Sequence, residues 1–204
     1  MATEPQQGDA SGSAPEGAGG PNPRGDAGGR SGWGELWETI QAVVIAIVLA
    51  LLIRQFVVET FRVDGVSMEP TLQNNERLLV NKFIYRFTKP KAGEIIIFLP
   101  PIPGQTQDFV KRVIAVGGQT FQMQNGVVYV NGKVQPEPYL PASWRGNASF
   151  GPVTVPLGDV WVLGDHRMDS EDSRIFGPVP ISAIRGEAML VWWPLSDFRV
   201  LPTR

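Results

Sequence analysis

A long apolar run early in the chain most constrains its fold. Residues 42–53 are twelve consecutive apolar side chains, and the run continues through 56–58 beyond a polar pair. The uninterrupted part alone would suit a buried helix, but a helix over 37–58 would be roughly 33 Å long at about 1.5 Å per residue. Because the run lacks the polar stripe of a helix packed on a protein core, we expect one transmembrane helix over 33–58.

The segments on either side of this run differ in composition. Residues 1–32 are rich in glycine and proline and nearly lack large apolar side chains, so we expect a disordered tail. Residues 59–204 alternate short apolar strands with turn residues, and two Asn-Gly pairs, at 125–126 and 131–132, predict hairpins. The fold class we expect is mostly β, an antiparallel β domain over 59–204 with a small insertion at about 117–158.

The composition also limits the chemistry. The chain has no cysteine and one histidine, which excludes thiol nucleophiles, cysteine-based zinc sites and the HExxH metalloprotease motif. We therefore expect no metal and no other cofactor. The formal net charge of −2 argues against a nucleic-acid partner. Catalysis would depend on serine, lysine, carboxylates, tyrosine or the single His166.

Ser67 is the first candidate nucleophile. It lies about nine residues past the apolar run, between Gly65 and Pro70, where its hydroxyl would stay close to a membrane surface. A nucleophilic serine needs a base to accept its proton. Taken alone, Ser67 would more simply be a turn or helix-capping residue.

Lys111 is the candidate base. Alternation along the strand 108–116 places Lys111 on the apolar face of Phe109, Val113 and Ala115, with Arg112 on the opposite face. Full burial can lower a lysine pKa by about 3–5 units, which would give a neutral amine able to accept a proton from Ser67. The alternative is a lysine on an edge strand with its ammonium group in water.

A polar segment at 164–174 follows the apolar strand 160–163. It contains His166 beside Asp165, which suggests a Ser–His–Asp triad, but neighbouring side chains in an extended segment point apart. Its carboxylates, arginines and two serines are typical of an ordered active-site loop.

Three segments in register resemble one protein family, the bacterial type I signal peptidases. The segments are Ser67-Met68-x-Pro70-Thr71-Leu72, Lys111-Arg112-Val113-Ile114 and Gly164-Asp165-x-Arg167-x-x-Ser170-x-Asp172-Ser173-Arg174-x-x-Gly177. The resemblance runs from about 37 to 194. It implies a membrane-anchored Ser/Lys protease that removes signal peptides from exported preproteins, after small residues of the Ala-x-Ala type. It also implies a cytoplasmic tail, an extracytoplasmic catalytic domain, and preproteins and the lipid bilayer as partners.

The resemblance assigns roles residue by residue. It implies that Ser67 is the nucleophile, Lys111 the general base and Ser170 the hydroxyl that orients the lysine. It implies that Asp172 and Arg174 form a charged pair that shapes the site. The same motif contains Asp165 and Arg167 as structural residues of the site.

Three features depart from the family pattern. One is Val116-Gly117-Gly118-Gln119, which replaces a more usual Leu-Pro-Gly-acidic turn. His166 stands where the family usually has asparagine, which argues against His166 as an essential base. Gly65 stands where some members carry a serine that donates to the oxyanion. The second oxyanion donor is therefore in doubt, and the backbone N–H of Ser67 would remain, as in other members with glycine there.

Two other functions stay open on the residues alone. A self-cleaving, repressor-type Ser/Lys peptidase would share the chemistry but would carry a DNA-binding domain in place of the apolar run. A non-enzymatic, membrane-tethered β domain would be favoured if Lys111 titrated near its ordinary pKa of about 10. Phe61, Trp192 and Trp193 could seat the domain on a membrane or pack in its core.

Overall fold

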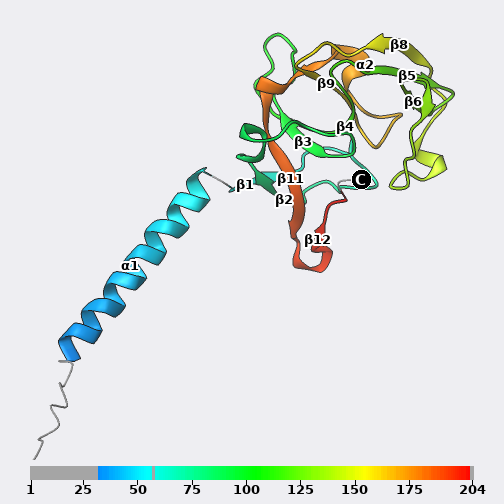
Figure 1. Ribbon diagram of the computed structural model, residues 1–204. Coiled ribbons are helices and arrows are strands. Elements are labelled where there is room, and N and C mark those ends of the chain that lie inside the picture. Colours follow the sequence, from blue (N-terminus) through cyan, green and yellow to red (C-terminus); the bar gives the residue numbers. More distant parts are fainter. Residues whose placement is uncertain (1–31, 57, 203–204) are drawn as a thin grey trace, which may run out of the picture. The chain divides into compact units, whose positions relative to one another are not determined.

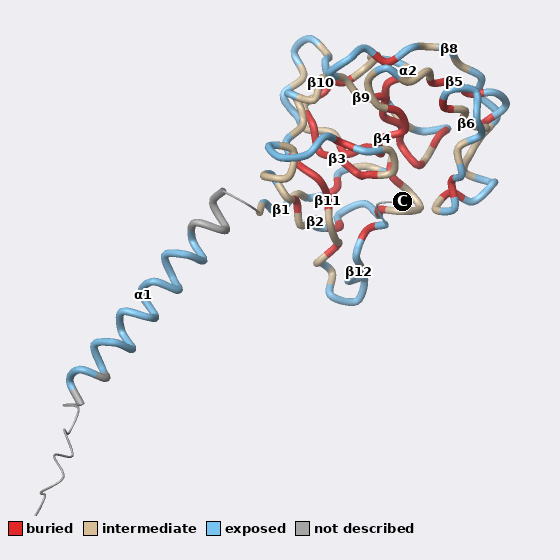
Figure 2. The backbone as a smooth tube through the Cα atoms, viewed as in Figure 1, coloured by how far each residue is buried: buried red, intermediate tan, exposed pale blue. Residues whose placement is uncertain are grey.

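The computed structural model describes residues 32–56 and 58–202. The tail expected over 1–32 therefore falls, except for Gly32, outside the described residues. Helix α1 runs over Gly32–Phe56 (Figure 1), which confirms the helical conformation expected there, although the helix ends before 58. Its side chains from 36 to 51 are all exposed (Figure 2).

The transmembrane helix expected over 33–58 was not found. Among the described residues, no helix combines the length and the apolarity that crossing a bilayer requires. The side chains of 52–57, which belong to the expected run, lie outside what the structure describes.

The β domain is built on an antiparallel main sheet of eight strands, in which neighbouring strands are often not consecutive in the sequence. The strand order is β1-β2-β11-β3-β4-β9-β10, and β12 pairs with β11. The strands are β1 (Val58–Arg62), β2 (Arg77–Asn81), β3 (Ile95–Phe98), β4 (Phe109–Val116), β9 (Asp159–Leu163), β10 (Val179–Pro180), β11 (Ile184–Trp193) and β12 (Arg199–Val200). The expected antiparallel β domain is confirmed, and β4, which carries Lys111, lies inside the sheet between β3 and β9 (Figure 1).

The expected insertion forms a second sheet, in the order β7-β6-β5-β8. Its strands are β5 (Thr120–Gln124), β6 (Val127–Val130), β7 (Lys133–Val134) and β8 (Phe150–Thr154). Both predicted Asn-Gly turns join its strands, and φ is positive at Asn125 (49°), Gly126 (78°), Asn131 (52°) and Gly132 (73°). Two-residue hairpin turns of type I′ require positive φ at both positions, so the hairpin prediction is confirmed.

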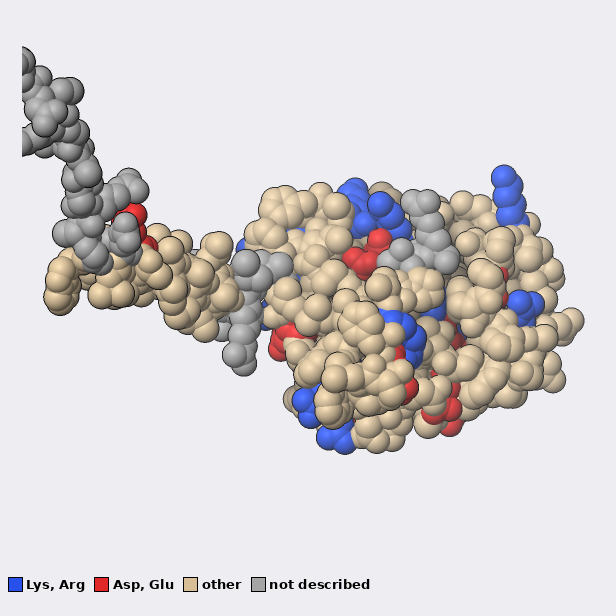
Figure 3. Space-filling model, turned by 90° about the horizontal axis from the view of Figure 1, so that it is seen from below, with Lys and Arg blue, Asp and Glu red and all other residues tan. Residues whose placement is uncertain are grey.

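Short helical turns complete the domain. They are η1 (Ile84–Arg86), η2 (Ala142–Trp144), α2 (Ser173–Phe176), η3 (Ile181–Ala183) and η4 (Leu195–Asp197). Over the face of the β domain seen in Figure 3, Lys and Arg atoms are interspersed with Asp and Glu atoms, in keeping with the small net charge of −2.

Buried apolar side chains form three clusters (red in Figure 2). The first includes Met68 and Leu72, which follow Ser67 in sequence, and Phe61 packs against it. The second lies between the two sheets, where the rings of Phe121 and Trp161 stack at 5.1 Å. Phe61 is thus a core-packing residue, whereas Trp193 is 46% exposed.

The alternation predicted along β4 is confirmed in part. Lys111 lies opposite Ile96 and Phe109 opposite Phe98, in register with β3. Ile96, Phe98 and Val113 belong to the third cluster, with Phe109 packed against it. The placement of Ala115 on this face was wrong: the β4–β9 register shifts between Val113 and Ala115, and Ala115 packs in the second cluster instead.

Candidate active site

Ser67 is held by a short turn after β1. The Glu69 N–H donates to the Val66 carbonyl (3.0 Å) and the Leu72 N–H to the Met68 carbonyl (2.9 Å). Met68 and Leu72 are buried in the first core cluster, so the turn is anchored directly beyond the serine. The Ser67 side chain therefore has a fixed backbone from which to project.

Lys111 meets this serine although it comes from the interior strand β4. Its Nζ donates to Ser67 Oγ at 2.8 Å and to the Val110 carbonyl at 3.1 Å. The Nζ also lies 5.1 Å from the centre of the Phe109 ring. The structure thus brings together the two residues that the sequence analysis paired.

Burial changes the acidity of Lys111. The residue is only 4% exposed, and burial lowers its pKa from 10.5 to about 8, against the opposing effect of the Asp172, Glu171 and Asp165 carboxylates. At about 1.4 kcal/mol per unit, this shift corresponds to on the order of 3 kcal/mol. At pH 7 roughly a tenth of the molecules would carry the neutral amine, compared with about one in three thousand for an ordinary lysine. Such an amine can act as a general base near neutral pH.

A cleft of about 360 Å³ opens beside the pair. Its lining combines apolar side chains, among them Phe61, Val66 and Phe109, with the carboxylates of Asp64, Asp108, Asp169 and Glu171. Within the described part of the chain, no group of three or more His, Cys, Asp or Glu side chains could hold a metal ion. The cleft offers room for a chain segment next to the Ser67 hydroxyl.

The segment 164–174, expected to be an ordered active-site loop, packs directly against the serine. The His166 N–H donates to the Ser67 carbonyl at 3.0 Å. A Cβ on Gly164 would lie 2.5 Å from that same carbonyl oxygen and closer still to Ser170, so only glycine fits there. The loop and the segment of Ser67 therefore depend on each other for their positions.

Ser170 lies in this loop, but no hydrogen bond joins it to Lys111. Its Oγ is buried and has no partner among the residues that the structure describes. The lysine instead uses Ser67 and the Val110 carbonyl. That Ser170 orients the lysine therefore stays a prediction.

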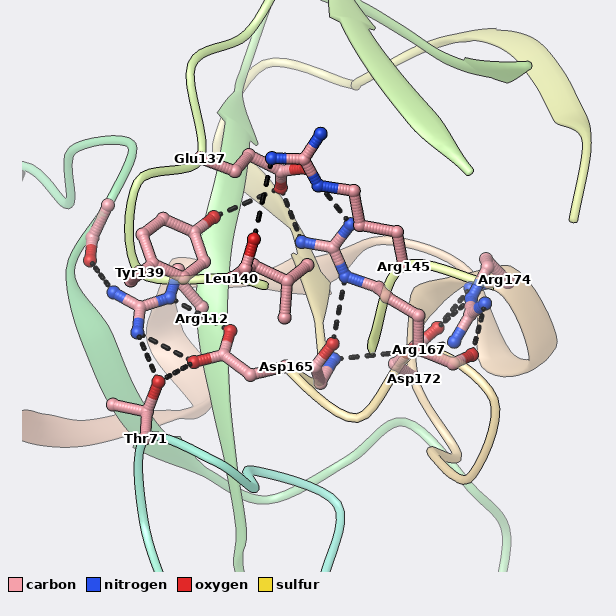
Figure 4. Close-up of polar contacts among 12 residues, drawn as sticks. Thr71, Arg112, Glu137, Tyr139, Leu140, Arg145, Asp165, Arg167, Asp172 and Arg174 are labelled. Atoms are coloured by element: carbon pink, nitrogen blue, oxygen red, sulfur yellow. Dashed lines mark hydrogen bonds and ion pairs between the residues drawn. The ribbon is translucent and has the colours of Figure 1, made fainter. Parts of the chain in front are cut away.

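Asp165 connects the segment that follows Ser67 with the strand of Lys111 (Figure 4). It is fully buried and accepts bonds from Arg112 Nε (2.9 Å) and Nη2 (2.7 Å), and from Thr71 Oγ1 (2.6 Å). Thr71 lies four residues after Ser67, and Arg112 follows Lys111. Through these bonds Asp165 joins the segment of Ser67 to the strand of Lys111. Removing one partner of the buried ion pair would leave the other charge uncompensated.

The two arginines of the motif, Arg167 and Arg174, also have carboxylate partners. Arg174 donates to Asp172 at 2.7 Å, and Asp172 caps helix α2 and accepts the Gly164 N–H at 3.1 Å. Arg167 donates from Nε to the Gly164 carbonyl (3.0 Å) and from Nη1 to Glu137 Oε2 (3.2 Å). Each arginine thereby fixes a different part of the loop backbone.

Glu137 and Tyr139 are the site residues that the sequence analysis missed. Glu137 is 5% exposed and pairs with Arg167, and the Tyr139 ring lies 3.7 Å from the Arg112 guanidinium carbon (Figure 4). A carboxylate between two prolines, Pro136 and Pro138, was the available signal. Through this segment the insertion contacts Arg167 and Arg112.

His166 and Asp165 do not form a triad with Ser67. The carboxylate of Asp165 is occupied by Arg112 and Thr71. The His166 ring lies edge-on to Trp144 at 4.6 Å, and its Nδ1 is buried without a partner among the described residues.

Gly65 has a conformational role of its own. Its φ is 96°, in the region that favours glycine, and its N–H donates to Asn74 Oδ1 at 3.1 Å. A serine at this position would have a strained backbone. This conformation accounts for glycine here in place of the serine that some family members carry.

Comparison with known proteins gives consistent results. A family model described as "Signal peptidase, peptidase S26" matches residues 36–193. "Signal peptidase I" of Bacillus amyloliquefaciens is 40% identical over 174 residues, which cover 80% of this chain and 88% of that protein. "Probable signal peptidase I-1" of Synechocystis sp. is 39% identical over 186 residues (85% and 94%), and "Signal peptidase I T" of Bacillus subtilis is 41% identical over 170 residues (78% and 86%).

Proposed function

The chain belongs to the S26 family of signal peptidases, and we propose that it removes signal peptides from exported preproteins with Ser67 as nucleophile and Lys111 as general base. The observation that carries this assignment is the 2.8 Å contact between Lys111 Nζ and Ser67 Oγ at the wall of an open cleft. The lowered pKa of Lys111 supports it, since the base must be neutral to accept a proton.

In the first half of the reaction, the neutral Lys111 amine accepts the hydroxyl proton while Ser67 Oγ bonds to the scissile carbonyl carbon. The carbonyl oxygen becomes an oxyanion, which the backbone N–H of Ser67 can stabilise. The carbon–nitrogen bond then breaks, and the Lys111 ammonium gives its proton to the departing amine of the mature protein. The signal peptide remains as an ester on Ser67.

In the second half, Lys111 accepts a proton from water, whose oxygen attacks the ester carbon. The carbon–Oγ bond breaks, Ser67 regains its proton from the lysine, and the signal peptide leaves with a free carboxylate. We assign Asp165, Arg167, Asp172 and Arg174 to positioning, because their bonds tie the loop to both reacting residues. Ser170, whose Oγ has no partner among the described residues, would orient the lysine amine.

Substrate choice would depend on the apolar part of the cleft. An extended peptide could add alongside 107–111 and 64–67, as peptides commonly add to strand edges. Phe61, Val66 and Phe109 would then limit the side chains that fit, which suits cleavage after small residues of the Ala-x-Ala type.

We also propose that residues 33–58 attach the protein to the bilayer, with 1–32 in the cytoplasm and the β domain 59–204 outside. The apolar run and the exposed apolar side chains of α1 support this arrangement. Alkaline carbonate extraction of membranes tests it: the protein should stay in the membrane pellet. Complete release into the supernatant would contradict the anchoring.

The function itself is tested by identifying the product. Full-length protein in detergent micelles is incubated with a preprotein that ends its signal peptide in Ala-x-Ala, and the mature fragment is sequenced from its N-terminus. We expect cleavage directly after the second alanine by wild type and by Ser196→Ala, which alters an exposed serine of η4. Cleavage elsewhere, or none by wild type, would refute the proposal.

A further inference from the structure

A second hollow, of about 410 Å³, is lined in part by the loop 164–174. Asp169 and Glu171 line the cleft, whereas Met168 and Ser170 line this hollow. The loop 164–174 therefore contributes side chains to both hollows. We call the second hollow the arginine pocket, because three arginines line it: Arg145, Arg167 and Arg174.

The arginine pocket carries uncompensated positive charge. Arg167 is paired with Glu137, and Arg174 with Asp172. Arg145 has no carboxylate partner among the described residues. Its guanidinium makes one hydrogen bond there, a long contact of 3.4 Å from Nη2 to the Leu140 carbonyl. Three guanidinium groups against two carboxylates leave an excess of one positive charge, which one carboxylate would neutralise.

The guanidinium of Arg145 is also poorly satisfied. Its Nε is buried without a hydrogen-bond partner in the described part of the protein, and Figure 4 shows its side chain beside that of Arg167. A buried polar group without a partner is unfavourable. An anionic ligand that draws the group into a bidentate contact would relieve both the unpaired charge and the unmade bond.

The arginine pocket lies close to the nucleophile. Trp144, which precedes Arg145, packs against the His166 ring at 4.6 Å, and the His166 N–H donates to the Ser67 carbonyl at 3.0 Å. Met168 approaches Gly146 so closely that a Cβ there would lie 2.9 Å from Met168 Cγ. A Cβ on Gly164 would clash both with Ser170, which lines the pocket, and with the Ser67 carbonyl, so the arginine pocket adjoins the segment of Ser67.

We propose that the arginine pocket binds an acidic side chain from the mature part of the preprotein, within the first few residues after the cleaved bond. This inference rests on the function proposed above. A carboxylate fits better than a doubly charged phosphate, because the excess charge of the pocket is one. Arg145 is then a specificity-determining residue that favours substrates with aspartate or glutamate at one such position.

The test compares preproteins that carry Asp or the isosteric Asn at each of the first four mature positions. With wild-type, full-length protein, we expect the kcat/KM for Asp to exceed that for Asn by about tenfold at one position. In Arg145→Gln this ratio should fall to about one, and in Arg145→Lys, which keeps a charge without the planar fork, it should be intermediate. Arg86→Gln, a change of an exposed arginine in η1, should leave the ratio as in wild type.

Two outcomes would overturn the inference: a wild-type ratio below twofold at all four positions, or a ratio in Arg145→Gln equal to that of wild type. If Arg145→Gln does not fold, the Asp-to-Asn ratios of kcat/KM in wild type still decide whether the inference holds. The Asn preprotein separates this inference from the function on which it rests. If that preprotein is cleaved after Ala-x-Ala and Asp brings no gain, only the inference fails; if neither is cleaved, the proposed function fails.

Discussion

The side-chain amine of Lys111 lies 2.8 Å from the hydroxyl oxygen of Ser67, although 44 residues separate them in the chain. Ser67 comes from the turn after β1, and Lys111 from a strand inside the sheet. Asp165 bonds to the segments of both, through Thr71 and Arg112. The serine hydroxyl and the lysine amine are thus in direct contact, with no histidine side chain between them.

The pH dependence of cleavage should report the Lys111 amine. Burial lowers the pKa of Lys111 to about 8, and the base works only when it is neutral. The kcat/KM should therefore be low well below pH 8, rise about tenfold per pH unit there, and level off above pH 8. A midpoint near pH 6.5, typical of an ordinary histidine base, would contradict this assignment.

Glu171→Gln should move that profile to lower pH. The Glu171 carboxylate lines the cleft and raises the pKa of Lys111, so its neutralisation removes an effect that favours the charged amine. The measurement is the midpoint of the kcat/KM profile. Glu59→Gln, a change of an exposed carboxylate paired with Lys82 in the structure, should leave the midpoint in place. A midpoint in Glu171→Gln that is unchanged or higher would be inconsistent with the electrostatic account.

Asp165→Asn should destabilise the protein strongly. It leaves the fully buried Arg112 guanidinium without a counter-charge, a change that typically costs about 3–5 kcal/mol. The free energy of unfolding of the full-length protein in urea, measured beside that of wild type, tests this. Asp197→Asn, which alters an exposed residue of η4, should cost less than about 0.5 kcal/mol. Equal stability of the two variants would show that the buried pair is not structurally important.

Gly65→Ser and Gly65→Ala should lose stability to a similar extent. The backbone at this position has a φ of 96°, which side chains disfavour by about 1–2 kcal/mol, and nothing lies within 4 Å of a Cβ there. The strain comes from the backbone, so the hydroxyl of serine should not reduce it. Urea unfolding of both variants checks this, and a serine variant as stable as wild type would contradict it.

His166→Asn should retain kcat/KM within about threefold, because no catalytic role is assigned to the ring, which packs against Trp144. Its pH midpoint should match that of wild type. The same preprotein assay measures both values. A hundredfold loss of activity, or a shifted midpoint, would instead make His166 part of the catalytic machinery.

Local patterns predicted the parts of the structure that depend on neighbouring residues. The Asn125-Gly126 and Asn131-Gly132 turns follow from backbone preferences within two residues. The shared face of Phe109, Lys111 and Val113 follows from strand alternation. Ala115 did not follow it, because a register shift against β9 depends on a partner strand that the local pattern does not identify.

The partners in the supporting ion pairs Arg167–Glu137 and Arg112–Asp165 were beyond prediction for a physical reason. Arg167 and Glu137 are 30 residues apart, and Arg112 and Asp165 are 53 apart. Such pairs form only after the two sheets and the loop 164–174 have come together. The Asp172–Arg174 pair was anticipated through the family resemblance, whereas the support from Glu137 and Tyr139 was not.

The central claim is that Ser67 and Lys111 act as nucleophile and base, and the kcat/KM for one preprotein in four variants tests it most directly. We expect Ser67→Ala and Lys111→Ala each to lose at least about a thousandfold, while Ser196→Ala and Lys133→Ala, which alter exposed residues, stay within twofold of wild type. Circular dichroism should confirm that all four variants are folded. Activity within tenfold of wild type in a folded Ser67→Ala or Lys111→Ala variant would contradict the account.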